Sequence, residues 1–140
     1  MTDQHNKNKQ ALALFRAALY DYDYDKLKQI IIDTFAEDVL IQFCHPFETL
    51  SGRSALLTEI YAPLVKAIPD LERRDTIMMA GGSNHSSQWV GCCGYYTGSF
   101  EQHWLDIPPT GHQVSMRFHE FYRFEAGKIV EVQAVWDIPE

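Results

Sequence analysis

The feature that most constrains the fold of this sequence is a change in hydrophobic period about halfway along the chain. Before residue 69 the apolar side chains mostly recur every three or four positions, as on the buried face of a helix, whereas after residue 71 they alternate, as in a strand with one buried face. Helices followed by several long strands are typical of an α+β fold, and they exclude a parallel, doubly wound sheet, in which helices and strands alternate. The sequence therefore predicts helices packed on one mostly antiparallel sheet.

The helical part divides into segments with recognisable ends. Residues 1–8 are polar and predict a disordered tail before the first helix. A second helix is expected after an N-cap at Asp23 or Asp25, because aspartate accepts hydrogen bonds from the free N–H groups of a first turn. A third helical stretch opens at Ser51-Gly52 and is expected to kink or divide at Pro63, which cannot donate to the helix ladder. The expected strands are residues 39–43, 71–80, 88–100, 114–124 and 128–137.

Three glycines, Gly91, Gly94 and Gly98, lie within one of the expected strands. Glycine weakens a strand and often marks a bulge, a bend or the close approach of another backbone. Three in one strand predict a strongly curved sheet, and such a sheet wrapped over helices forms a cone with a concave side that can enclose a pocket. A chain of 140 residues is long enough for one sizeable core and too short for two, so residues 9–140 are expected to form a single domain.

The charge balance limits the partners of the chain. Its net charge is −7, and its 12 lysines and arginines are scattered. The only dense basic run, Arg73-Arg74, is flanked by Glu72 and Asp75, and we expect it to be a solvated strand edge. Binding a phosphate backbone requires a clustered basic surface. Nucleic acid is therefore excluded as a partner.

The apolar segments and the cysteines indicate the compartment. No apolar run approaches the roughly 20 residues that span a bilayer. The polar start of the chain lacks the apolar core of a signal peptide, and Cys44, Cys92 and Cys93 lack the spacing of a zinc site. We therefore expect a cytoplasmic protein with reduced cysteines and no membrane partner.

Glu120 is the most informative residue of the chain. In the strand 114–124 the even positions are apolar except for Glu120, and the odd positions are largely polar. Alternate side chains of a strand face opposite ways, so Glu120 is expected on the buried face. Burial there would raise the pKa of the carboxyl group, as general acid/base catalysis requires. The alternative is that Glu120 pairs with a buried arginine or tyrosine and only specifies the fold.

Other constellations point less clearly to chemistry. His103 and Trp104 lie in a loop beside the expected mouth of the pocket, where loop residues often carry function. His45, His103 and His119 have no spacing typical of a metal site, and no serine or cysteine has a recognisable activating base. The three strand glycines are no dinucleotide-binding fingerprint, because no helix opens after them. We therefore expect neither a metal nor a cofactor.

Several short motifs occur in an order and spacing that resemble a known family. Ser51-Gly52 opens a helix, and Ile68-Pro69-Asp70-Leu71 closes it. The remaining motifs are Gly94-x-x-Thr97-Gly98, Pro108-Pro109-Thr110-Gly111, Phe121-x-Arg123-Phe124, Gly127-Lys128-Ile129-Val130-Glu131 and Asp137. From about residue 11 to its end the chain resembles the SnoaL-like polyketide cyclases, also called predicted ester cyclases, of the nuclear-transport-factor-2-like superfamily.

The resemblance implies a reaction and a set of site residues. Characterised members close a polyketide ring by intramolecular aldol condensation without metal or cofactor. They use an acid/base aspartate on the penultimate strand and an assisting histidine on the preceding long strand.

Glu120 and Tyr96 stand at these two positions and are the expected catalytic residues. The residues expected to bind substrate are Tyr95, His103, Trp104, Phe118, Tyr122, Gln133 and Trp136. The stretch 99–107 is longer than the usual link and is expected to be a lid, and the resemblance also implies a homodimer.

Two functions remain open at this point. The first is a cofactor-independent acid/base enzyme that cyclises or isomerises a small apolar carbonyl compound, with Glu120 as the base and Tyr96, aided by Tyr95 or His103, stabilising an enolate oxygen. The second is a non-catalytic module that binds a small apolar ligand or serves mainly as a dimer. A carboxylate within reach of a bound ligand would favour the enzyme, whereas a Glu120 locked in a salt bridge would favour the module.

Overall fold

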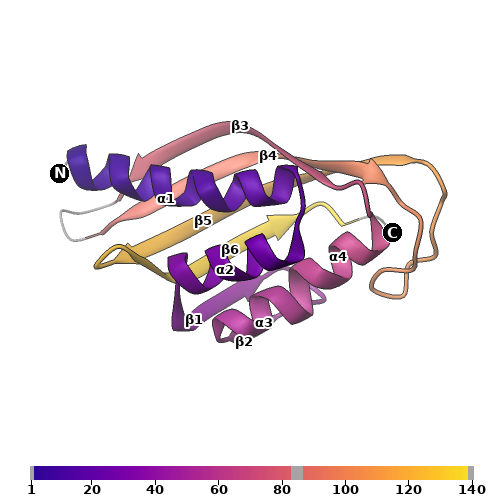
Figure 1. Ribbon diagram of the computed structural model, residues 1–140, viewed down its shortest axis with the longest axis horizontal. Coiled ribbons are helices and arrows are strands. Elements are labelled where there is room, and N and C mark those ends of the chain that lie inside the picture. Colours follow the sequence, from indigo (N-terminus) through magenta and orange to yellow (C-terminus); the bar gives the residue numbers. More distant parts are fainter. Residues whose placement is uncertain (1, 83–86, 139–140) are drawn as a thin grey trace.

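The computed structural model describes residues 2–82 and 87–138, which form a curved sheet with helices on one side (Figure 1). The sheet has six strands in the order β2-β1-β6-β5-β4-β3. Neighbouring strands are antiparallel except β1 and β6, which run parallel. The predicted α+β fold with a mostly antiparallel sheet is therefore confirmed. The strands are β1 Phe35–Phe43, β2 Thr49–Ser51, β3 Glu72–Gly81, β4 Trp89–Ser99, β5 Gln113–Glu125 and β6 Lys128–Trp136.

The first helix, α1, extends further toward the N-terminus than the sequence predicted. It spans Thr2–Tyr20, so the predicted disordered tail is wrong for residues 2–8, and Met1 lies outside the described residues. The reason is a long-range contact, since the buried Asn8 donates a hydrogen bond to the side chain of Gln88 at 3.2 Å. Because the segment is polar, its sequence did not indicate a helix, although one of its polar side chains, Asn8, attaches it to Gln88.

The second and third helical segments follow their predicted signals. Helix α2, Tyr24–Thr34, has Asp23 as its N-cap, and the Asp23 carboxylate accepts from the backbone N–H of Lys26 at 3.1 Å. The next helix changes type along its length: α3 is Arg53–Ala55, η1 is a π-helix over Leu56–Tyr61, and α4 is Ala62–Ala67. The π-helical turn ends two residues before Pro63, where the α-helix resumes. The expected interruption at Pro63 is thus a change of helix type just before the proline.

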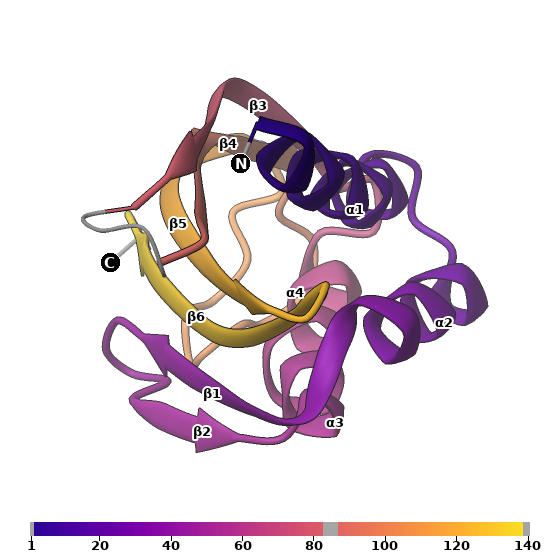
Figure 2. The same cartoon turned by 90° about the vertical axis from the view of Figure 1, so that its left-hand side faces the viewer.

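Close backbone approaches accompany the curvature of the sheet (Figure 2). The pairing of β3 with β4 shifts register between Asp75 and Ile77. Beside this shift, a Cβ atom on Gly94 would lie 2.0 Å from the backbone oxygen of Arg74. A Cβ atom on Gly98 would lie 2.3 Å from Cγ2 of Ile68. The predicted curved sheet is confirmed, and two of its strand glycines are needed for these contacts.

The core lies between the helices and the concave side of the sheet (Figure 2). Aromatic side chains occupy much of it, including Phe15, Phe35 and Tyr61, whose rings meet edge to face at 5.2 and 5.6 Å. The sequence also predicts tight turns at Ala126-Gly127 and at Gly81-Gly82-Ser83-Asn84. The first is found between β5 and β6, and the last two residues of the second lie outside the described residues. Within the described ranges, no helix is both long enough and apolar enough to cross a membrane.

Candidate functional site

Glu120 lies at the centre of the concave side of the sheet and is 0% exposed. It is on β5, between Cys92 of β4 and Ala134 of β6, which are its partners in the sheet register. Its neighbours on the same face of β5, Phe118 and Tyr122, are also buried. The alternation of β5 therefore points Glu120 inward, as its sequence pattern indicated.

The two carboxylate oxygens of Glu120 accept four hydrogen bonds. Oε1 accepts from Nη1 of Arg73 at 2.8 Å and from the hydroxyl of Tyr122. Oε2 accepts from the hydroxyl of Tyr96 at 2.9 Å and from Nε1 of Trp136 at 2.7 Å. These five residues, which we call the Glu120 cluster, come from β3, β4, β5 and β6. A carboxylate has about four lone-pair positions, and all of them are used here.

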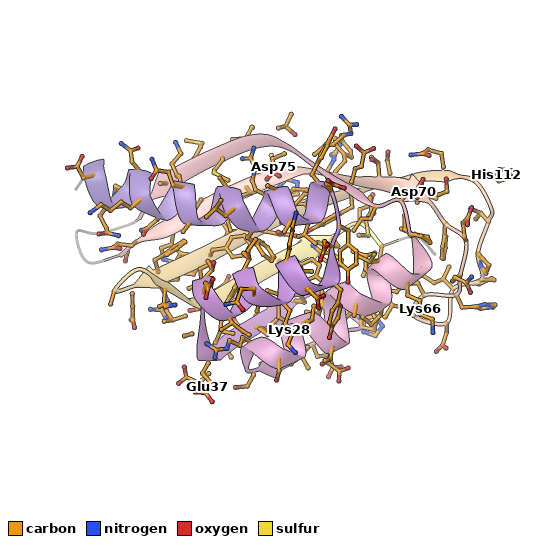
Figure 3. All side chains as sticks on the ribbon, in the orientation of Figure 1. Lys28, Glu37, Lys66, Asp70, Asp75 and His112 are labelled. Atoms are coloured by element: carbon orange, nitrogen blue, oxygen red, sulfur yellow. The ribbon has the colours of Figure 1, made fainter. Side chains whose placement is uncertain are left out.

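Arg73 is the charge partner of Glu120, and its side chain is completely buried. Its guanidinium also binds both oxygens of Asp75, at 3.0 and 3.3 Å, and lies 4.3 Å from the centre of the Phe118 ring. Asp75 in turn lies 3.7 Å from Arg16 of α1, where β3 passes over that helix (Figure 3). Successive ion pairs thus connect Glu120 at the centre of the core with Arg16 beside the edge strand of the sheet.

The burial of Arg73 corrects the prediction of a solvated strand edge at Arg73-Arg74. Only Arg74 is exposed there, and it pairs with Glu72 at 3.1 Å. The sequence did indicate the burial of Arg73. Residues two positions apart point to the same face of a strand, and Leu71, two positions before Arg73, is buried. The signal was weak because every residue from Glu72 to Asp75 is charged. The alternative stated for Glu120, that it pairs with a buried arginine or tyrosine, is the arrangement found.

The tyrosines around Glu120 remain protonated donors. Burial raises the pKa of Tyr122 and of Tyr61, and the nearby charge of Glu120 raises both further. Burial also raises the pKa of Tyr96 well above its ordinary value, although Arg73 opposes the shift. Burial alone would lower the pKa of Arg73, but Glu120 together with the surrounding tyrosines more than offsets this, so that the pKa is raised. The cluster is therefore an ion pair supported by neutral phenols.

This arrangement leaves little room for chemistry at Glu120. A general base needs a free lone pair within hydrogen-bond reach of the substrate. A hollow of about 450 Å³ between α1 and β3 touches the cluster only at Arg73, and a second one of about 430 Å³, beside α2 and η1, does not touch it. Cys92 is the thiol paired with Glu120 in the sheet register, and burial raises its pKa to about 12. It therefore stays neutral and supplies no nucleophile.

The other predicted site residues divide between the two faces of the sheet. Phe118, Tyr122 and Trp136 lie with Glu120 on the concave side, and Trp104 is buried in the loop after β4. Tyr95 and Gln133 lie on the opposite, convex face, because their neighbours Tyr96 and Ala134 take the inward positions. His103 is exposed to solvent. The structure thus corrects the placement of Tyr95, Gln133 and His103, which do not face Glu120.

Four aromatic rings close one end of the core beside the Glu120 cluster. Phe43, Phe47, Trp104 and Trp136, which we call the aromatic end, have ring centres 5.0 to 6.4 Å apart. Phe47 lies in the loop between β1 and β2, and Trp104 lies in the loop between β4 and β5, which passes beside the end of α4 (Figure 1). The backbone N–H of Glu101 donates to the carbonyl oxygen of Ala67 at 2.9 Å, which attaches this loop to α4.

Comparisons with known proteins agree with this architecture. The structure is similar to that of AclR from Streptomyces galilaeus, with a TM-score of 0.75 and 23% identity over 94% of this chain and 79% of the other. A protein from Jannaschia sp. CCS1, described as a SnoaL-like polyketide cyclase, has a TM-score of 0.76 and 18% identity over 94% and 86% of the two chains. IdmH from Streptomyces antibioticus has a TM-score of 0.72 and 17% identity over 93% and 91%.

The TM-scores show a shared fold, which is nuclear-transport-factor-2-like. At these low identities the assignment to a family depends on the sequence. A search of curated proteins gives no match. The sequence model of the SnoaL-like polyketide cyclases, in contrast, matches residues 10–138, which is most of the chain. The chain therefore belongs to the SnoaL-like polyketide cyclase family.

Proposed function

We propose that this chain is a non-catalytic member of its family that binds a small, largely apolar molecule at its aromatic end. The observation that carries the proposal is the saturation of Glu120, whose two oxygens already accept from Arg73, Tyr122, Tyr96 and Trp136. The carboxylate that the family position would use for acid/base chemistry has no free acceptor position. In this fold it serves to hold four strands together.

The energetics of the cluster support the same proposal. To accept a substrate proton, Glu120 would have to lose at least one buried donor, which would then be unsatisfied at a cost of about 1–3 kcal/mol. Neutralising the carboxylate would also remove one of the two carboxylate partners of Arg73, the one at 2.8 Å, and leave only Asp75. Weakening a buried ion pair in this way is destabilising. The contacts of the cluster thus oppose the use of Glu120 as a base.

The aromatic end supports ligand binding. Small-molecule sites are lined mainly by apolar and aromatic side chains with a few polar groups. Phe47 and Trp104 lie on two separate loops, and Phe47 is only partly buried. A ligand bound at this end would contact these two loops, which lie outside the strands that carry Glu120.

We expect the purified protein to bind planar apolar compounds and to leave them unchanged. Equilibrium dialysis against fluorene, 9-fluorenone, indane and 1-indanone should show saturable binding of at least one compound to the folded chain and none to chain unfolded in urea. Native mass spectrometry of the protein as purified should reveal any ligand that is already bound. Chromatography and NMR after long incubation should return the bound compound intact. The proposal would be contradicted if neither equilibrium dialysis nor native mass spectrometry showed a bound compound, or if a bound compound were converted.

We further propose that the chain forms a homodimer through the convex face of its sheet. Two rows of residues cross this face, and each follows the sheet register. One row is Met79, Gly91, Phe121 and Gln133, and the other is Ile77, Cys93, His119 and Val135. Met79 and Val135 are 69% and 62% exposed, and the two rows contain no carboxylate although the chain carries a net charge of −7. Two copies can therefore meet here without opposing like charges.

The dimer should dissociate when a charge is placed in the middle of these rows. Phe121→Glu would put two buried carboxylates into the interface, which is costly. Light scattering during size-exclusion chromatography should therefore give a dimer for the wild type and a monomer for Phe121→Glu. Leu14→Glu is the control, because Leu14 is 64% exposed on α1, away from this face, and the variant should remain dimeric. A monomeric wild type at about 100 µM, which is far above the Kd of a stable dimer, would contradict the proposal.

A further inference from the structure

Trp104 carries a buried hydrogen-bond donor that has no partner. Its side chain is 4% exposed, and its Nε1 atom has no acceptor among the residues that the structure describes. Trp136, the other indole of the aromatic end, donates to Glu120 at 2.7 Å. Buried donors are almost always satisfied, and an unsatisfied donor costs free energy. The two indoles therefore differ in one respect: the N–H of Trp104 is left for an acceptor that the described residues do not supply.

The surroundings of Trp104 explain why the chain offers no acceptor. The rings of Phe47 and Trp136 lie 6.3 and 6.4 Å from the Trp104 ring, and neither carries an acceptor atom. The backbone of Trp104 is closed in a tight turn, in which the N–H groups of Trp104 and Ile107 each donate to the other residue's carbonyl oxygen, at 3.1 and 2.8 Å. The backbone groups of this turn are thus already paired with each other.

The same turn fixes the position of the indole. Leu105 and Asp106, the two residues inside the turn, have φ angles of 52° and 64°, in the left-handed region that non-glycine residues rarely adopt. Such conformations persist only where the surrounding contacts impose them, and they often occur at sites that clamp a ligand. Trp104 is therefore held in place by its backbone, and it keeps its orphan N–H in spite of the cost.

We propose that Nε1 of Trp104 donates a hydrogen bond to a neutral carbonyl oxygen of the ligand and so selects carbonyl compounds over hydrocarbons. This inference rests on the proposed binding function and adds the chemical class of the ligand. An anionic ligand does not fit, because residues 99–112 contain no lysine or arginine but include Glu101 and Asp106. Arg73, the cation nearest to the core centre, is already bound to Glu120 and Asp75. A neutral oxygen satisfies the indole N–H without a buried charge.

The test compares 9-fluorenone with fluorene, which have the same ring system with and without a carbonyl group. The wild type should bind 9-fluorenone on the order of tenfold more tightly than fluorene in equilibrium dialysis, as expected for one buried hydrogen bond. Trp104→Phe keeps an aromatic ring and removes the N–H. It should bind both compounds with the affinity that the wild type has for fluorene. Trp89→Phe is the control, because Trp89 lies at the opposite end of β4, and it should behave as the wild type.

The outcomes separate this inference from the function on which it rests. If neither compound binds to the wild type, the proposed binding function fails. If the wild type and Trp104→Phe prefer 9-fluorenone equally, the carbonyl contact is refuted while the binding function stands. The ratio of the two affinities also excludes a purely structural effect. Packing lost with the larger indole would weaken the binding of fluorene and 9-fluorenone alike, whereas loss of the N–H removes only the preference for 9-fluorenone.

Discussion

Glu120→Gln should lower the free energy of unfolding by about 3–5 kcal/mol, the cost of breaking a buried ion pair by removal of one partner. Glutamine has nearly the shape of glutamate, so packing is preserved. Its amide oxygen can replace only one of the two carboxylate oxygens, and its NH₂ group would face two of the four donors that Glu120 now accepts. The charge of Arg73 would also lose one of its two carboxylate partners and keep only Asp75. Urea denaturation followed by tryptophan fluorescence measures the effect.

Glu125→Gln is the matched control for this substitution. Glu125 lies on the same strand and also pairs with an arginine, Arg123, at 2.8 Å, but its side chain is 66% exposed. Its loss should change stability by no more than about 0.5 kcal/mol. A Glu120→Gln protein as stable as the wild type would contradict the structural role of the cluster. If that protein also lost a measurable turnover, Glu120 would return to the role of a catalytic base.

A double-variant cycle tests the partnership of Glu120 with Arg73 directly. Arg73→Met should be about as destabilising as Glu120→Gln, because it leaves the Glu120 carboxylate buried without its cation. The double variant Arg73→Met/Glu120→Gln should lose less stability than the sum of the two single variants, since neither charge remains unpaired. Additive effects would mean that the two residues do not interact, in conflict with their contact at 2.8 Å.

The face on which Glu120 lies could be predicted because it depends on one local rule. In a strand with strict alternation, a charged residue that lies among the apolar positions faces the core together with them. In β5 these are the even positions, and the alternation continues over the whole length of the strand. Gln133 was misplaced although the same rule applies to β6, where Val132 and Ala134 take the inward positions. Parity assigns a residue correctly only when it is applied to every residue of the strand.

The partner of Glu120 could not be predicted because it depends on contacts far apart in the chain. Arg73 and Glu120 are 47 residues apart and become neighbours only through the order β5-β4-β3. The same limit concealed the anchoring of Asn8 to Gln88, which are 80 residues apart. The sequence analysis placed both Arg73 and the segment that contains Asn8 in solvent. Most polar residues are indeed exposed, but this rule fails where two buried polar residues form hydrogen bonds with each other. The saturation of Glu120, on which the proposed function rests, therefore required the structure.

Gly94→Ala should be strongly destabilising although it removes no polar side chain. The added Cβ atom would lie 2.0 Å from the backbone oxygen of Arg74 and 2.8 Å from Cα of Asp75, so that β3 and β4 must separate. Backbone atoms cannot rotate away as a side chain does, and we expect a loss of about 3 kcal/mol or more. Gly81→Ala is the control, because a Cβ atom there meets nothing within 4 Å, and urea denaturation should give nearly wild-type stability.

The position of Gly94 connects this effect with the Glu120 cluster. Arg74, whose carbonyl oxygen Gly94 must accommodate, lies between Arg73 and Asp75, which form the ion pair beneath it at 3.0 Å. Moving this segment of β3 outward would carry the guanidinium of Arg73 away from Glu120. Gly94→Ala and Glu120→Gln should therefore not be additive, because the first already weakens the contact that the second removes. If their effects on the free energy of unfolding add fully, the close approach at Gly94 serves the curvature of the sheet alone and does not position the buried ion pair.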